Sequence, residues 1–324
     1  MKKFMKGCAV TAFVFAIVGF VLGLVGGTRA GRSTIFQIVD SVTGGKAHIF
    51  HRNWWGWGIE SDNDLIDTGQ WEHDMEEDYY DESMFDQEHE ILKGDVDKYC
   101  PGSGIRNLDI EAGGCRLITE LSQDDSIYLE VSNGYVFQGF VKDDTLYIKS
   151  SRSTLSWAEK DNCTITLYLP ADYHFLEVEA EIGAGYMQLD RLAAEDVSLE
   201  AGAGQIELDS PQIQNVEITV GAGSVSLCNM NAAYLDVEVG MGELYAEGIL
   251  NGDADVECSM GSVTMELNGR ESDYNYEVEG SMGNIDIQGE NYIGLGQERS
   301  INNHADKTIS VECSMGYVSV VFVE

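Results

Sequence analysis

The chain is poor in proline, in positive charge and in paired cysteine motifs, and each shortage excludes a class of protein. Only 3 of its 324 residues are proline, so long proline-rich linkers are excluded. The 19 Lys and Arg stand against 56 Asp and Glu, which gives a formal net charge of −37. Such an acidic chain repels phosphate backbones, so we predict that it binds no nucleic acid and favours cations or basic partners.

The N-terminus is basic and then apolar. Residues 1–7 carry three lysines, and an uncharged, mostly apolar run follows from Cys8 to Val25. This run has the length of a membrane-spanning helix, which needs roughly 17–25 such residues, whereas the apolar core of a cleaved signal peptide has about 7–15. We therefore predict a cytoplasmic N-terminus over residues 1–7 and a transmembrane signal anchor over residues 8–27. A cleaved signal peptide and a cytosolic protein are the alternatives.

Two further segments separate this run from the rest of the chain. Residues 28–59 combine apolar residues near helical spacing with the cluster Trp54 to Trp57, which is typical of a membrane interface. Residues 60–90 hold fourteen Asp and Glu and no Lys or Arg, so this block repels itself and stays extended. We predict a juxtamembrane segment over residues 28–59 and a flexible acidic linker over residues 60–100.

The remainder of the chain repeats a short glycine phrase. The first five units begin at a constant spacing, at positions 183, 202, 221, 240 and 259, and the last two begin later than this spacing requires, at 281 and 314. A fixed period of roughly twenty residues is the mark of a solenoid, in which each unit stacks on the one before. The seven phrases are Gly183-Ala184-Gly185, Gly202-Ala203-Gly204, Gly221-Ala222-Gly223, Gly240-Met241-Gly242, Ser259-Met260-Gly261, Ser281-Met282-Gly283 and Ser314-Met315-Gly316.

Apolar and polar residues alternate on both sides of each phrase, as at Ile206 and Leu208, so each unit has two strands with an apolar lining. We predict an all-β fold over residues 101–324, with an N-terminal transmembrane helix before it. The fold is a β-solenoid, a single-stranded β-helix with rungs of about 19 residues and two main strands per rung. Residues 105–170 form less regular early rungs that close its N-terminal end.

The last units are longer, which predicts loops over residues 268–274 and 288–307. After them the final strand, Val318 to Val323, ends the chain with only Glu324 beyond it. An open solenoid end presents unpaired backbone groups, so we predict that another segment covers this outer rung or that the edge contacts a partner, which includes self-association.

The seven cysteines include no Cys-x-x-Cys pair, which excludes zinc-ribbon and thioredoxin-type sites. The repeat order places Cys258 and Cys313 at inward positions two rungs apart. That separation is about 9.6 Å, beyond the ~7 Å limit between the Cα atoms of a disulfide, so we predict two buried free thiols. The disulfide state stays open for Cys100, Cys115, Cys163 and Cys228, and Cys100–Cys115 is the pairing to test.

Leu169-Pro170 before a strand, followed by the Gly-Ala-Gly units after a single N-terminal span, resembles the bacterial putative-adhesin family of β-strand-repeat proteins. The resemblance covers roughly residues 105–324. It implies a β-solenoid on the cell surface and, in some members, an association with envelope-stress systems, but it brings no catalytic residues. The chain departs from the family pattern at the three Ser-Met-Gly phrases, which change the surface of the corner.

The strand before each glycine phrase carries most of the outward charge. Two neighbouring columns on it hold Asp or Glu at eleven of fourteen positions, against three of fourteen on the other strand. Like charges placed opposite each other destabilise a sheet, so this face recruits cations or raises carboxylate pKa values. We predict a weak face for loosely bound Ca²⁺ or Mg²⁺ or for a basic ligand; a merely solvated acidic surface is the alternative. The face comprises Glu181, Glu200, Glu217, Asp236, Glu238, Asp255, Glu257, Glu277 and Glu279.

These features predict a non-enzymatic, single-pass protein of the bacterial cell membrane whose solenoid lies outside the cytoplasm and binds an envelope polymer or a protein. One alternative is a structural or envelope-stress accessory protein that acts with membrane partners through residues 1–58. A more remote one is an enzyme that acts on polysaccharides with clustered carboxylates. The regular face contains no His, Lys or Arg, so no catalytic or cofactor-binding residue is predicted.

Overall fold

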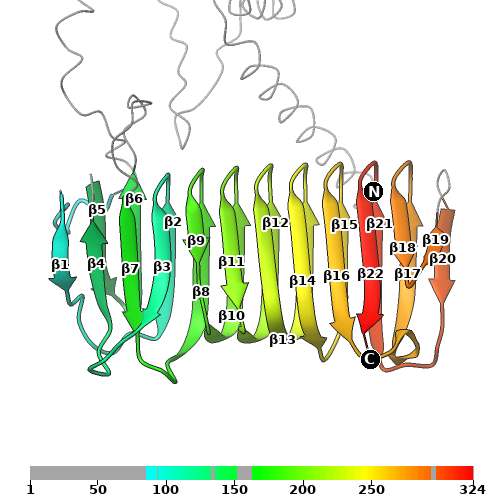
Figure 1. Cartoon of the computed structure of the whole chain (residues 1–324), viewed down its shortest axis with the longest axis horizontal. Coiled ribbons are helices and arrows are strands. Elements are labelled where there is room, and N and C mark those ends of the chain that lie inside the picture. Colours follow the sequence, from blue (N-terminus) through cyan, green and yellow to red (C-terminus); the bar gives the residue numbers. More distant parts are fainter. Residues whose placement is uncertain (1–84, 93, 133–135, 152–162, 293–296, 324) are drawn as a thin grey trace, which may run out of the picture. The chain divides into compact units, whose positions relative to one another are not determined.

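Figure 1 shows a computed structural model of the chain. The residues that the structure describes are 85–92, 94–132, 136–151, 163–292 and 297–323. The predicted N-terminus, signal anchor and juxtamembrane segment lie outside these residues. Over the described ranges, no helix has the length and apolar character to cross a membrane.

Strands dominate the described residues, with one short 3-10 helix, η2 (Glu271–Asp273), between β16 and β17. The alternating burial of their side chains follows the alternation in the sequence. The strands are β1 (Val96–Tyr99), β2 (Asn107–Ala112), β3 (Arg116–Leu121), β4 (Tyr128–Ser132), β5 (Val136–Lys142), β6 (Thr145–Ser151), β7 (Thr164–Leu169), β8 (His174–Ile182), β9 (Tyr186–Gln188), β10 (Ala193–Ala201), β11 (Gln205–Asp209), β12 (Gln212–Val220), β13 (Ser224–Val239), β14 (Glu243–Leu250), β15 (Ala254–Cys258), β16 (Ser262–Asn268), β17 (Tyr274–Gly280), β18 (Asn284–Ile287), β19 (Glu290–Tyr292), β20 (Gln297–Ile301), β21 (Lys307–Cys313) and β22 (Tyr317–Val323).

Each rung gives one strand to each of two sheets, which are parallel except at their ends. The first sheet runs in the order β5–β6–β2–β8–β10–β12–β13–β15–β21–β17–β20. The second runs β1–β4–β7–β3–β9–β11–β13–β14–β16–β22–β18–β19. The long strand β13 bends and belongs to both. The prediction of an all-β, two-strand repeat is confirmed.

Two rungs lie out of chain order. The first, β2 and β3, lies between β6/β7 and β8/β9. The last, β21 and β22, lies between β15/β16 and β17/β18, as the red β22 in Figure 1 shows. Of the two alternatives for Val318 to Val323, coverage by another segment is confirmed, because β22 has a parallel neighbour on each side.

Antiparallel strands close both ends of the solenoid. At the N-terminal end β5 pairs with β6, β4 with β7 and β1 with β4. At the other end β20 pairs with β17 and β19 with β18. The segment 288–307, predicted as a loop, thus supplies two capping strands. These strands reverse the pairing direction and end the parallel stack, which limits its growth by edge pairing.

The strand domain also begins earlier than predicted. Phe85 is buried, and β1 lies inside the span that the sequence analysis assigns to a flexible linker over residues 60–100. Gln138 on β5 is fully buried, and its side-chain amide donates to the carbonyl oxygens of Asp86 and His89 at 2.8 and 2.9 Å. Its side-chain oxygen accepts from the Asp86 amide at 2.8 Å. These bonds fix the segment against the end of the solenoid.

The glycine phrases form the tight corner between the two strands of a rung. None of their glycines has a positive φ, so close approach explains them better than backbone freedom. A Cβ on Gly204 would lie 2.9 Å from the carbonyl oxygen of Gly185, and one on Gly242 would lie 2.6 Å from Cγ1 of Val220. The third position of each phrase therefore tolerates no side chain without displacing the rung before it.

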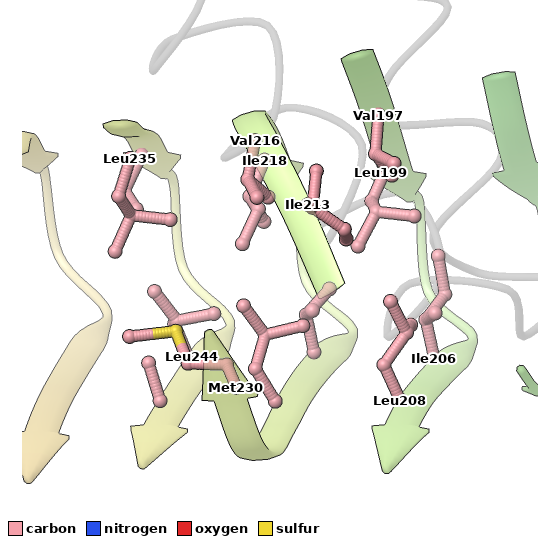
Figure 2. Close-up of a cluster of buried hydrophobic side chains, with 14 of the residues drawn as sticks. Val197, Leu199, Ile206, Leu208, Ile213, Val216, Ile218, Met230, Leu235 and Leu244 are labelled. Carbon is pink, nitrogen blue, oxygen red and sulfur yellow. The ribbon is translucent and has the colours of Figure 1, made fainter. Parts of the chain in front are cut away.

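The opposite corner repeats a left-handed residue once in each of several successive rungs. Arg191, Ser210 and Asn229 have φ values of 55°, 56° and 53°, and Gly248 follows one rung later with φ 139°. Between the two corners the inward columns of both sheets meet in a single core, and Figure 2 shows apolar side chains of neighbouring rungs pointing toward one another. The core is continuous along the stack, so each rung depends on its neighbours for burial.

The cysteines depart from the predicted order. Cys258 and Cys313 are buried, as predicted, and free in this structure, but the distance argument against a bond between them is wrong, because they are direct register partners on β15 and β21 rather than two rungs apart. The rung that was expected between them, which contains Gly280, lies beyond Cys313. Cys115 is buried, and its neighbour across the rungs is Cys163.

A candidate cation-binding face

One column of glutamates runs along the outward side of the first sheet. In spatial order it reads Lys149, Glu111, Glu181, Glu200, Thr219, Glu238, Glu257, Glu312, Glu279 and Glu298. Neighbouring rungs are about 4.8 Å apart, so eight carboxylates stand in one line with Thr219 as the one interruption. The sequence order of the repeats predicts that Glu279 follows Glu257 and that Glu312 comes last. In the structure Glu312 lies between Glu257 and Glu279, because the last rung is inserted there.

A second column lies two residues earlier on the same strands. It reads Tyr147, Asp109, Glu179, Ser198, Glu217, Asp236, Asp255, Ser310, Glu277 and Ser300. We call the outward side of these two columns the acidic face. All nine residues predicted for a cation face lie on it, and all of them except the half-buried Glu181 are exposed.

The second sheet carries far less charge at the equivalent positions. Its two outward columns nearest the glycine corner hold three acids, Glu207, Glu243 and Asp286, among sixteen residues, and further acids such as Glu247 and Glu266 lie in the next column. Two of these acids are engaged locally: Glu207 accepts from the hydroxyl of Tyr186 at 2.6 Å, and Asp286 accepts from the Gly289 amide at 2.9 Å. The negative charge is therefore concentrated on the first sheet.

The N-terminal part of the acidic face holds its carboxylates against strong mutual repulsion. Burial and the charges of Glu200, Glu111 and Asp109 raise the pKa of Glu181 to about 7. Burial and the charge of Glu111 raise the pKa of Asp109 to about 6. One cation relieves this crowding, because Lys149 Nζ lies 2.6 Å from Oε1 of Glu111.

The middle of the face shows the same crowding. Burial and the charge of Glu257 raise the pKa of Glu238. Beside it, the hydroxyl of Tyr234 donates to Asp255 at 2.8 Å, and this bond and burial raise the pKa of the tyrosine to about 12. The predicted consequence of stacked carboxylates, raised pKa values, is thus present at three positions of the face.

The repeat matches the model of a known family. The Toastrack DUF4097 family model covers residues 105–321, well over half of the chain. The chain belongs to this family. No curated protein sequence matches the chain.

The Toastrack chain is similar to several solved structures, each at low sequence identity. A putative adhesin from Bacteroides fragilis is 13% identical, with 72% of this chain and 97% of that chain covered and a TM-score of 0.38. A putative lipid binding protein from Parabacteroides distasonis is 13% identical, with 72% and 99% covered and a TM-score of 0.36. A putative cell adhesion protein from Clostridium sporogenes is 13% identical, with 72% and 99% covered and a TM-score of 0.30.

The Toastrack rungs also place four methionines in a row along the glycine corner, which we call the methionine ridge. The middle residues of four consecutive corners are Met241, Met260, Met315 and Met282, and Met315 and Met282 donate their amides to Ser259 and Ser314 of the preceding corner at 2.7 Å. Met282 is 67% exposed and Met315 is 49% exposed. The Gly-Met-Gly and Ser-Met-Gly phrases already make these four corners consecutive in the sequence, and the inserted rung exchanges the order of Met282 and Met315. The ridge borders the acidic face, since each corner begins directly after a strand of the first sheet.

The described part of this Toastrack chain offers no converging metal-ligand set. Among the residues that the structure describes, no three or more His, Cys, Asp and Glu side chains are placed to hold one metal ion. The carboxylates of the acidic face lie in a line rather than in a cage. Such a line attracts several cations through its summed field, and it does not provide the six to eight oxygen ligands of a Ca²⁺ site.

Proposed function

We propose that the chain is a non-enzymatic, membrane-anchored extracytoplasmic binding module whose acidic face holds a cationic partner, either a basic envelope polymer or a basic protein segment. The observation that carries this proposal is the line of eight glutamates across nine strands of one sheet. A folded protein gains nothing in stability from stacking like charges, because like charges placed opposite each other destabilise a sheet.

A polyvalent cation fits this geometry better than a single metal ion. The carboxylates repeat at the rung spacing, so a partner with several positive groups in a row can neutralise several of them at once. Binding such a partner also favours ionisation of Glu181 and Asp109, whose pKa values are raised to about 7 and about 6. Affinity should therefore increase between pH 5 and pH 8 and decrease with added salt.

The N-terminal segments complete the proposal. A signal anchor over residues 8–27 would hold the solenoid at the membrane, and the acidic block over residues 60–90 would keep it away from anionic lipid surfaces. Protease added to intact cells tests this arrangement. We expect digestion of the acidic block and retention of residues 1–27 in the membrane fraction; protection of the whole chain until the cells are lysed would contradict it.

The binding claim is tested with the full chain in mild detergent and a lysine homopolymer as the probe. Replacing Glu200, Glu238 and Glu257 by glutamine removes three carboxylates from the acidic face. The matched control replaces Glu207, Glu243 and Glu266 of the second sheet by glutamine, which removes the same charge elsewhere. We expect the first variant to lose at least about tenfold in affinity at low salt and the control to lose about twofold or less. Equal losses would show that net charge alone attracts the probe.

A further inference from the structure

Four of the cysteines form two pairs at equal register on adjacent parallel strands. Cys258 and Cys313 are partners on β15 and β21. Cys115 and Cys163 directly precede Arg116 and Thr164, which are partners on β3 and β7, and the Arg116 amide donates to the Cys163 carbonyl at 2.8 Å. Register partners in a sheet have Cα atoms about 4.8 Å apart, within the roughly 4.4–6.8 Å range of disulfides.

Cys115 occupies a position that is glycine in every later rung. Backbone bonds align Gly113, Gly114 and Cys115 with Gly183, Ala184 and Gly185 of the next rung. At this third position a Cβ points at the preceding rung, where it would strike that rung's backbone, as at Gly204. For Cys115 the preceding rung is that of Cys163, and interaction with the Cys163 thiol together with burial raises the pKa of Cys115. The one corner that replaces glycine with cysteine therefore directs its sulfur at another cysteine.

The second pair is buried in the core. Cys258 and Cys313 are 2% and 0% exposed and are direct register partners on adjacent strands. Cys258 Sγ lies against Gly316, in the corner of the rung that holds Cys313, so it already reaches toward the partner rung. The column reads Val239, Cys258, Cys313 and Gly280, and the Sγ of Cys313 lies against Gly283, on the side away from Cys258. The sulfur of Cys313 therefore turns toward Cys258 when the bond forms.

Both pairs join rungs that are neighbours in space but not in sequence. Cys115 and Cys163 connect the inserted first rung to the rung outside it, and Cys258 and Cys313 connect the inserted last rung to the rung inside it. Each link closes a long loop at the place where the chain leaves sequential order. A covalent bond there restricts the unfolded chain strongly, because the stabilisation grows with loop length.

We propose that Cys115–Cys163 and Cys258–Cys313 form disulfides when the chain folds in an oxidising compartment, and that these bonds lock the two inserted rungs. The inference rests on the extracytoplasmic placement in the proposed function. Each bond forms by thiol–disulfide exchange with a small or protein disulfide: one thiolate attacks the oxidant to give a mixed disulfide, and the second displaces it. The two cysteine thiols lose two protons and two electrons, and the oxidant leaves as two thiols.

To test this, the reduced full chain is refolded in a glutathione redox buffer. The remaining thiols are then blocked with N-ethylmaleimide in denaturant, and the linkages are mapped by proteolysis and mass spectrometry. Of seven cysteines, we expect three to be labelled, with peptides linked at Cys115–Cys163 and Cys258–Cys313. Labelling of all seven, or a linkage such as Cys100–Cys115, would overturn the proposal. Reduction should lower the melting temperature by at least about 5 °C per bond.

Single variants separate the two bonds, and one serves as a control. Cys163→Ser, at a half-buried position, should remove one linkage and part of the stabilisation; Cys313→Ser should remove the other. Cys228→Ser should leave both linkages and the effect of reduction unchanged. If the linkages form during refolding but all thiols are free in chain trapped directly from cells, the placement outside the cytoplasm is wrong and the pairing stands. If no linkage forms in either preparation, the pairing itself is wrong.

Discussion

Replacing Glu181 with glutamine removes the carboxylate that is most crowded by its neighbours on the acidic face. Glu181 lies between Glu111 and Glu200 in the glutamate column and is half-buried. Burial and these charges raise its pKa from 4.5 to about 7. The folded state therefore binds the proton more tightly than the unfolded state. The carboxylate favours folding when it is protonated and costs stability as the pH rises from about 4.5 to 7.

The size of the effect follows from the two pKa values. A difference from 4.5 to about 7 corresponds to about 3 kcal/mol at ~1.36 kcal/mol per pH unit. Because the side chain is partly exposed and water screens it, we expect about 1–2 kcal/mol. Glutamine keeps the size of the side chain without its charge. The Glu181→Gln variant should therefore melt roughly 3–6 °C above the parent at pH 8 and equal it near pH 4.5.

Thermal melts followed by circular dichroism between pH 4.5 and pH 8 provide the assay. Glu195→Gln, an exposed position on β10 outside the acidic face, is the matched control and should not change the pH dependence. A Glu181→Gln chain that is no more stable than the parent at pH 8 would refute the reasoning, because it would mean that neither burial nor the neighbouring carboxylates destabilise the charged form of Glu181.

Three further changes test the corners, the inserted rung and the field of the face. Gly242→Ala places a Cβ 2.6 Å from Cγ1 of Val220 and should cost about 1–3 kcal/mol in a denaturant titration, whereas Ala203→Ser at an exposed corner position should be neutral. Gln288→Ala removes the oxygen that accepts from the Phe322 amide at 2.6 Å and should cost about 1 kcal/mol, with Gln288→Glu recovering part of the loss; no change in either would contradict a role for this bond in holding β22. Millimolar Mg²⁺ or Ca²⁺ at low ionic strength should raise the melting temperature more than NaCl of equal ionic strength, and the absence of any shift would argue against a cation-attracting face.

The acidic columns were predictable because they depend on two local periods. Alternation sets which residues point outward, and the constant repeat sets which of them stack, so Glu181, Glu200 and Glu238 followed directly from the sequence. Neither the strand alternation nor the repeat length depends on where the last rung of the chain joins the stack. The same reasoning could not place Glu111, Glu298 or Lys149 in the column, since the early and capping strands do not carry the glycine phrase.

The rung order was not predictable from spacing. The longer intervals before Ser281 and Ser314 show that residues are inserted, but they do not show where the chain rejoins the stack. Tyr274 and Tyr276 were a signal: both are buried, and both rings lie beside Phe322. Tyr276 continues a column that holds Leu235, Ala254 and Ile309 on the rungs before it. Large aromatic residues at inward positions indicate a rung at the end of a core, where more space must be filled.

The orientation of a bound cationic chain on the solenoid tests the central claim most directly. Carbodiimide cross-linking joins a lysine amine to a carboxylate that it contacts, so a lysine peptide bound to the full chain reports its own position. We predict cross-links at Glu200, Glu238 and Glu257, which decrease with added salt and increase between pH 5 and pH 8. Cross-links that are equally frequent at Glu207 and Glu243 of the second sheet would contradict a binding function for the acidic face.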